Sequence, residues 1–145
     1  MGTRGAFALA IALSAGGCGL VPSRPIVVVY PAQGSLPEFP VTLVDPAGFV
    51  RDVAIGGPAV GGSFDRGGSV TQIRGIPTAA VVSWIGGACD VRATATVELR
   101  ESTIVVAMTT DQGRGCILLG IPRRLTLDFV EPIGARELAL DRAAP

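Results

Sequence analysis

The stretch that decides the fold is VRATATVELRESTIVVAMTT, residues 91–110. In its first half, apolar residues at every second position alternate with charged or hydroxyl-bearing ones. A period of two is typical of a strand that has one buried face and one solvated face. The second half continues the pattern, with Ile104, Val106 and Met108 on the apolar side. We therefore predict two antiparallel strands joined as a hairpin.

The apolar positions also predict the register of this hairpin. A turn at residues 101–102 places Leu99 opposite Ile104 and Val97 opposite Val106, so that apolar side chains face one another. A shift by one residue would set Leu99 against Thr103, because every side chain would then change faces.

Extended outward, the same register brings the two cysteines of the domain together. Cys89 comes opposite Arg114, two residues from Cys116, and a small bulge around Gly113 or Gly115 would let the sulfurs meet. The spacing is not Cys-x-x-Cys, and without His there are too few ligands for zinc. We therefore predict a structural disulfide between Cys89 and Cys116.

Other short runs outside the hairpin predict further strands. Residues 26–30 form a β-branched run suited to a strand buried on both faces. Residues 41–44 and 49–53 flank the turn sequence Asp-Pro-Ala-Gly and predict a second hairpin. The remaining candidates are residues 69–73, 79–85 and 124–129, with residues 137–140 as a last short strand or a single helical turn.

No segment carries a helical period of 3.6 residues, and turns rich in Gly and Pro are frequent, including residues 31–40 and the glycine-rich loop 56–68. This pattern predicts an all-β fold: a small single-domain antiparallel β-sandwich or barrel with one disulfide.

The N-terminal segment has the features of an export signal. Arg4 gives a positive start, residues 5–15 are apolar, and small residues lead to Cys18. The apolar run is too short to span a bilayer. We expect a signal peptide over residues 1–17, a tether over residues 18–25 and a single extracytoplasmic β-rich domain over residues 26–145.

The end of this signal, Ala15-Gly16-Gly17-Cys18, resembles the lipobox of bacterial lipoproteins. The resemblance implies cleavage before Cys18 and lipid attachment to it, which anchors the exported protein to a membrane. The alternative is ordinary signal-peptidase cleavage, which leaves a soluble secreted protein with an unmodified Cys18. A lipid on Cys18 would also explain the odd number of cysteines, because Cys89 and Cys116 then remain as a pair.

The composition removes several classes of chemistry. His, Lys and Asn are absent, and all 12 basic residues are Arg. The chain therefore has no His-based catalytic triad, no imidazole metal site and no Schiff-base or phosphate-loop lysine. A net charge of zero argues against nucleic acid as a partner. We expect no cofactor and no metal.

Two stretches resemble a known group of proteins. They are the segment from Trp84 to Cys89, which reads Trp-x-Gly-Gly-x-Cys, and a strand ending in Pro-Ile-Gly-Ala-Arg at residues 132–136, with Cys116 between them. This pattern, over about residues 41–141, resembles uncharacterised secreted proteins and lipoproteins of high-GC bacteria. The resemblance implies a small β-rich extracytoplasmic domain with the Cys pair bonded, and it transfers no activity.

Four side chains are candidates for binding. Phe64 in the glycine-rich loop and Trp84 together would form a binding surface, whereas Trp84 beside a disulfide is alternatively a core residue. Arg123 and Arg124 would bind an anion; alternatively, Arg124 lies on the wet face of its strand and Arg123 at the start of that strand.

Carboxylates are the remaining route to catalysis. The candidate pairs for glycosidase-type acid and base are Glu98 with Glu101 and Asp128 with Glu131. Three aspartates, Asp45, Asp52 and Asp65, would have to meet to hold Ca²⁺, but the Asp-x-Asp-x-Asp-Gly loop is missing.

The function predicted from the sequence is a bacterial cell-envelope lipoprotein whose β-domain binds or supports an envelope protein or cell-wall component without catalysis. We assign no catalytic residue. The alternative is a small secreted hydrolase that uses paired carboxylates.

Overall fold

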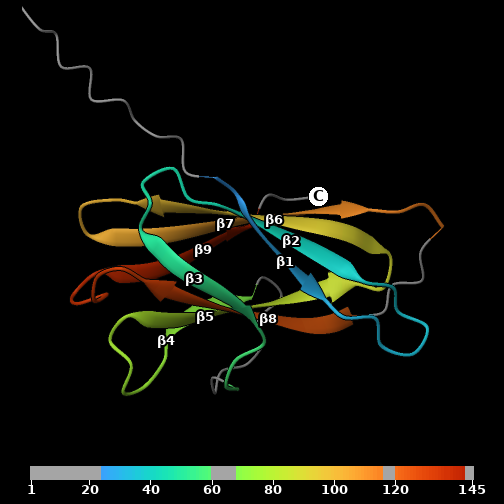
Figure 1. Cartoon of the computed structure of the whole chain (residues 1–145), viewed down its shortest axis with the longest axis horizontal. Coiled ribbons are helices and arrows are strands. Elements are labelled where there is room, and N and C mark those ends of the chain that lie inside the picture. Colours follow the sequence, from blue (N-terminus) through green and yellow to red (C-terminus); the bar gives the residue numbers. More distant parts are fainter. Residues whose placement is uncertain (1–23, 60–67, 116–119, 143–145) are drawn as a thin grey trace, which may run out of the picture.

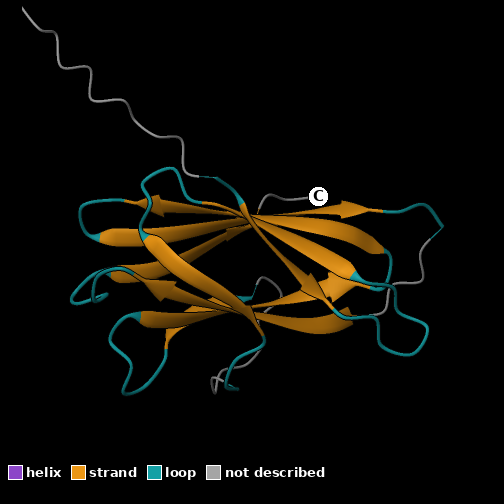
Figure 2. Ribbon diagram, in the orientation of Figure 1, coloured by secondary structure: helices purple, strands orange, loops and turns teal. Residues whose placement is uncertain are grey.

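The computed structural model describes residues 24–59, 68–115 and 120–142, and the regular structure in these ranges is entirely β-strand (Figure 1). The strands form two sheets that face each other as layers, rather than one closed sheet (Figure 2). The all-β prediction is confirmed, and of its two architectures the structure has the sandwich.

In the described residues, one layer contains five strands and the other contains four. The five-stranded sheet has the order β1 (Ile26–Tyr30), β2 (Phe39–Val44), β6 (Asp90–Leu99), β7 (Thr103–Gln112) and β9 (Glu137–Arg142). The four-stranded sheet has the order β3 (Val50–Ile55), β8 (Gly120–Phe129), β5 (Ala79–Gly87) and β4 (Ser69–Gln72). The prediction of a purely antiparallel sandwich is wrong, because β2 pairs with β6 in parallel, as β7 does with β9. Alternation of apolar residues predicts a buried face but carries no information about strand direction.

The hairpin of β6 and β7 has the predicted register. Leu99 pairs with Ile104 and Val97 with Val106, and the backbone N–H of Arg100 donates to the carbonyl of Thr103 at 2.8 Å across the turn. The apolar residues of both strands were therefore sufficient to predict how these strands pair.

The bulge in this hairpin lies on β6, not around the two predicted glycines. The register shifts between Asp90 and Arg92, so that Val91 is exposed and Asp90 is buried. The backbone N–H of Gly113 donates to the carbonyl of Cys89 at 2.8 Å. Cys89 therefore lies opposite Gly113, one position from the partner predicted by the sequence.

The second predicted hairpin is wrong, although its turn is present. The N–H of Gly48 donates to the carbonyl of Asp45 at 3.2 Å, and the Asp45 carboxylate accepts from the N–H of Val50 at 2.6 Å. The strands on either side, β2 and β3, belong to different sheets. Turn chemistry determines where the chain reverses, but the partner of each strand depends on which layer buries its apolar face.

The outer strands settle two further expectations. β1 is an edge strand whose Val27 and Val29 are exposed, so the prediction of burial on both faces is wrong. The prediction used only the length and composition of this run. An unbroken β-branched run can form either a central strand or an edge strand, so these features do not distinguish the two positions. The segment at the C-terminal end forms the strand β9, which excludes the helical alternative.

The core lies between the sheets and includes the alternating apolar residues of the hairpin except Val91 and Leu99, which are exposed at the ends of β6. Its largest fully buried side chains include Trp84, Phe39, Phe129, Leu43, Ile104 and Met108.

Glycines at both ends of the glycine-rich loop pack closely on the four-stranded sheet. A Cβ added to Gly57 would lie 2.7 Å from the Thr126 hydroxyl, and one added to Gly68 would lie 2.2 Å from the carbonyl oxygen of Ser83. Both glycines also have positive φ, at +144° and +97°. Gly57 therefore lies against β8 and β5, and Gly68 lies against the backbone of β5 and Leu140 of β9.

We predict that Gly68→Ala destabilises the protein far more than Gly75→Ala. Gly75 also has positive φ, at +82°, but has open space around it. Gly75→Ala should therefore cost about 1 kcal/mol, and Gly68→Ala, which adds a backbone clash, about 3 kcal/mol or more. Urea unfolding followed by the fluorescence of the single Trp measures both. Equal losses for the two variants would contradict the close packing of Gly68.

Candidate functional site

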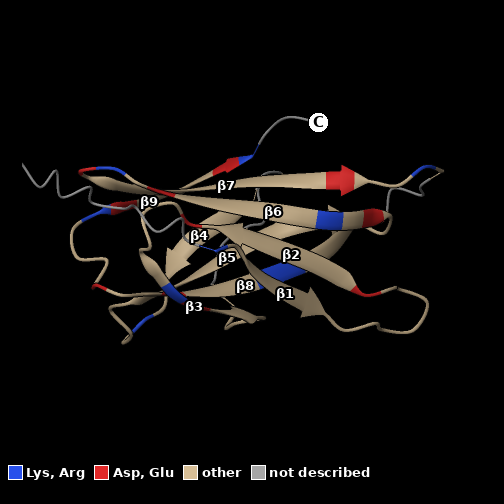
Figure 3. Ribbon diagram, turned by 45° about the horizontal axis from the view of Figure 1, so that its top comes forward, with Lys and Arg blue, Asp and Glu red and all other residues tan. Residues whose placement is uncertain are grey.

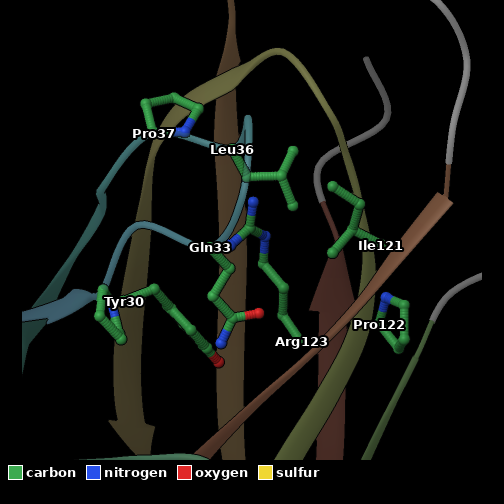
Figure 4. Close-up of a pocket in the computed structure, with 8 residues that line it drawn as sticks. Tyr30, Gln33, Leu36, Pro37, Ile121, Pro122 and Arg123 are labelled. Carbon is green, nitrogen blue, oxygen red and sulfur yellow. The ribbon is translucent and has the colours of Figure 1, made fainter.

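A pocket lies at one end of the sandwich, between the end of β1, the loop that follows it and the start of β8 (Figure 4). Its volume is about 130 Å³. The lining residues are Tyr30, Pro31, Gln33, Leu36, Pro37, Ile121, Pro122 and Arg123. The loop is closed by two reciprocal backbone hydrogen bonds between Gln33 and Leu36, of 3.1 and 2.9 Å. The pocket therefore combines mainly apolar walls with one charged group.

The charged group, Arg123, points toward the interior of the sandwich. β8 begins at Gly120, so Arg123 is already within the strand and shares the inner face with Leu125 and Leu127. Only 8% of its surface is exposed, whereas Arg124 lies on the opposite face, as predicted. Figure 3 shows the basic segment of β8 beneath β1 and β2, with acidic and basic residues otherwise spread over both sheets.

Aromatic side chains hold the guanidinium of Arg123. Its Cζ lies 3.7 Å from the ring centroid of Phe39 and 5.3 Å from that of Tyr30. The Tyr30 hydroxyl donates to the carbonyl of Arg124, and its ring meets Trp84 edge to face at 6.3 Å. A cation over aromatic faces is stabilised by the ring quadrupoles. These contacts fix the position of Arg123 without neutralising its charge.

A buried carboxylate approaches Arg123 from the turn between β5 and β6. Asp90 is 5% exposed, and its Oδ2 accepts from the N–H of Gly87 at 2.6 Å. A Cβ added to Gly86 would lie 2.8 Å from Asp90 Oδ2 and 3.0 Å from Arg123 Nε. The two glycines of the Trp-x-Gly-Gly-x-Cys segment therefore leave the space into which Asp90 and Arg123 converge.

The guanidinium of Arg123 lacks a hydrogen-bonding partner among the described residues. No ion pair within 4.0 Å and no hydrogen bond engages it there, and its Nε is both buried and unpartnered. Burial lowers the pKa of Arg123, and the neighbouring Tyr30 and Asp90 oppose that effect. An unpaired buried charge costs free energy, so this arrangement favours an incoming anion.

The two aromatic residues predicted to form a binding surface have different outcomes. Trp84 is fully buried, so its proposed place on a surface is wrong and the alternative, core packing, is confirmed. It shares the inner face of β5 with Ala80 and Val82, because side chains two residues apart point to the same side of a strand. Phe64 lies outside the described residues, as do Cys18 and Cys116.

Three of the four candidate catalytic carboxylates bind arginines near the surface, and the fourth, Glu101, is exposed in the turn between β6 and β7. Arg100 lies 2.9 Å from Glu98, Arg51 2.6 Å from Asp128, and Arg136 3.6 Å from Glu131. Hydrogen bonding from Arg51 lowers the pKa of Asp128. A general acid at neutral pH needs the opposite shift.

The aspartates considered for Ca²⁺ have other roles where they are described. The carboxylate of Asp52 accepts from the N–H of Val53 at 2.9 Å, that of Asp45 binds the turn before β3, and Asp65 lies outside the described ranges. In those ranges no three His, Cys, Asp or Glu side chains gather as metal ligands.

Sequence reasoning named Arg123 but missed the site around it. The signal was present, because Arg123 is in phase with Leu125, Leu127 and Phe129 and so belongs to the inner face if the strand starts earlier. The contributions of Tyr30, Phe39 and Asp90 had no such signal, since they come from distant segments.

Comparison with known proteins finds no match among family models, curated proteins or solved structures. In the part of the chain that the structure describes, no helix is long and apolar enough to cross a membrane.

We predict that Tyr30 titrates at unusually high pH. Burial raises its pKa to about 12, against about 10 for an exposed tyrosine. Because the folded pKa lies above the unfolded one, the contribution of Tyr30 to stability is complete below about pH 10 and is lost as the pH rises toward 12. Tyr30 is the single Tyr, so tyrosinate absorbance reports it directly.

The fluorescence of Trp84, followed in the same titration, separates ionisation in the folded protein from unfolding. Tyr30→Phe should abolish the absorbance change. A midpoint near pH 10 while Trp84 fluorescence is still native would contradict the buried position of the hydroxyl.

Proposed function

We propose that this protein is an exported, lipid-anchored β-sandwich of the bacterial cell envelope that binds a small ligand at Arg123 without catalysing a reaction. The observation that carries the binding role is the buried Arg123: its side chain lines the pocket, and none of the described residues forms an ion pair or hydrogen bond with it. The envelope location is supported by the signal-like segment and the lipobox-like residues before Cys18.

The proposed anchor is a lipid on Cys18. Two or three acyl chains give stable membrane attachment, at about 0.8 kcal/mol for each buried CH₂ group. β1 starts at Ile26, so residues 18–25 would form the tether between the lipid and the sandwich.

The proposed disulfide joins Cys89 to Cys116. The hydrogen bond between Gly113 and the carbonyl of Cys89 supports it, because it brings the chain three residues before Cys116 against Cys89. Closing a loop of this length would stabilise the fold by roughly 3.5 kcal/mol in the chain-entropy model.

A binding role fits the described pocket better than catalysis does. Its polar side chains are those of Arg123, Gln33 and Tyr30, and the Tyr30 hydroxyl already donates to a backbone carbonyl. The described lining of the pocket contains no carboxylate, while Glu98, Asp128 and Glu131 are paired with arginines elsewhere. These groups suit recognition of a ligand by charge and shape.

We predict two diagnostic peptides from the protein extracted with detergent from membranes and digested without reduction. Mass spectrometry should find Cys18 as an acylated N-terminal residue and a peptide pair linked through Cys89 and Cys116. Cys18→Ser should lose the acyl mass and leave the membrane but keep the linked pair. An unmodified Cys18 in the membrane-derived protein would contradict the anchor, and free thiols at both other cysteines would contradict the disulfide.

We also predict that the pocket binds small molecules in solution. Saturation-transfer NMR with a set of neutral, cationic and anionic fragments should detect binding to the wild-type protein and loss of that binding in Ile121→Trp, because the larger ring fills the pocket. Val91→Trp is the matched control, since Val91 is exposed and absent from the pocket lining. If no fragment distinguishes Ile121→Trp from the wild type, the binding function is wrong.

A further inference from the structure

We infer that the Arg123 pocket takes a carboxylate attached to a compact apolar group. This inference rests on the proposed binding function and names its ligand class. Two sources share this chemistry: a free short-chain carboxylic acid, and the C-terminal residue of a peptide.

The first argument is the charge of the site. Arg123 is the one charged residue in the described lining of the pocket, and Asp90, outside that lining, converges with Arg123 Nε in the space that Gly86 leaves. One arginine beside a buried carboxylate can accommodate a single negative charge, whereas a doubly charged phosphate would face Asp90 with too little compensation. Charge therefore favours a monoanion.

The second argument is the orientation of the guanidinium. Phe39 covers one of its faces at 3.7 Å, which leaves the N–H groups at its edge for a ligand. Figure 4 shows the Arg123 side chain directed into the space between the loop carrying Gln33 and Leu36 and the start of β8. A planar guanidinium matches a planar carboxylate through two parallel hydrogen bonds. The Gln33 amide, which lines the same pocket, supplies a further donor.

The third argument is the size and polarity of the walls. Leu36, Pro37, Ile121 and Pro122 surround the charged group with apolar surface, and the volume is about 130 Å³. An apolar protein cavity of about 150 Å³ binds benzene, so this space can take a compact apolar group of similar size. A short branched aliphatic group on the carboxylate fills it, whereas a sugar would leave its hydroxyls against apolar walls.

The test is calorimetric titration of the full exported protein in detergent with two acids and their neutral amides. Isovalerate represents a free acid and N-acetyl-leucine a peptide C-terminus; isovaleramide and N-acetyl-leucinamide have the same shape without the charge. We expect at least one acid to bind about tenfold or more tightly than its amide, since hydrogen bonds to a charged partner are the strong ones. Whichever acid binds more tightly identifies the source.

Variants of two adjacent arginines assign the effect to one side chain. Arg123→Gln should weaken binding of the acid by about tenfold or more and remove the preference for acid over amide. Arg123→Lys, which keeps the charge but loses the planar fork, should give an intermediate loss. Arg124→Gln, on the opposite face of β8, should leave the affinity within about twofold of the wild type, which is less than 1 kcal/mol. Trp84 fluorescence checks that each variant is folded.

The outcomes separate the ligand class from the proposed function. Equal affinity for acid and amide, or an unchanged affinity in folded Arg123→Gln or Arg123→Lys, overturns the carboxylate assignment. If neutral fragments still bind the wild type and not Ile121→Trp, the binding function survives that result. Absence of binding by any fragment overturns both.

Discussion

The structure depends on the register of β6 against β7. This pairing places one row of apolar side chains from each strand in the core, and β2 and β9 add to its two outer edges. At its open end the register shifts by one residue and buries Asp90 in place of Val91. The pairing of β6 with β7 therefore also places the Asp90 carboxylate near Arg123.

Arg123 stands apart from the rest of this interior. The remaining inner positions of β8 are apolar, and an apolar side chain would avoid the cost of desolvating a guanidinium. Phe39 and Tyr30 offset part of that cost through their rings, and Asp90 through its charge. A charge that is held in place but left without a hydrogen-bonding partner is suited to binding, because the ligand supplies the missing interaction. The cost of burying Arg123 therefore supports the proposed binding role.

Prediction from sequence succeeded where the signal was local and repeated. The turn at residues 101–102 follows from many alternating positions that agree on one register. Prediction failed where one local sequence pattern is compatible with two different strand arrangements. The turn at residues 45–48 joins two sheets instead of two paired strands, and the β-branched run of β1 lies at an edge. The bulge at Asp90 was missed because it depends on an N–H at Gly87 that becomes available only when the turn has formed.

The sequence by itself determined the strand content, the central hairpin with its register, and the absence of His, Lys and Asn that limits the available chemistry. These properties depend on composition and on a period of two, which need no knowledge of distant contacts. Only the tertiary structure decided which layer each strand joins, which pairs run parallel, and that Tyr30, Phe39, Asp90 and Arg123 meet at one end of the sandwich. The physical reason is that each of these residues is positioned by a different strand, so their proximity follows from the packing of two sheets and from no feature of any single segment.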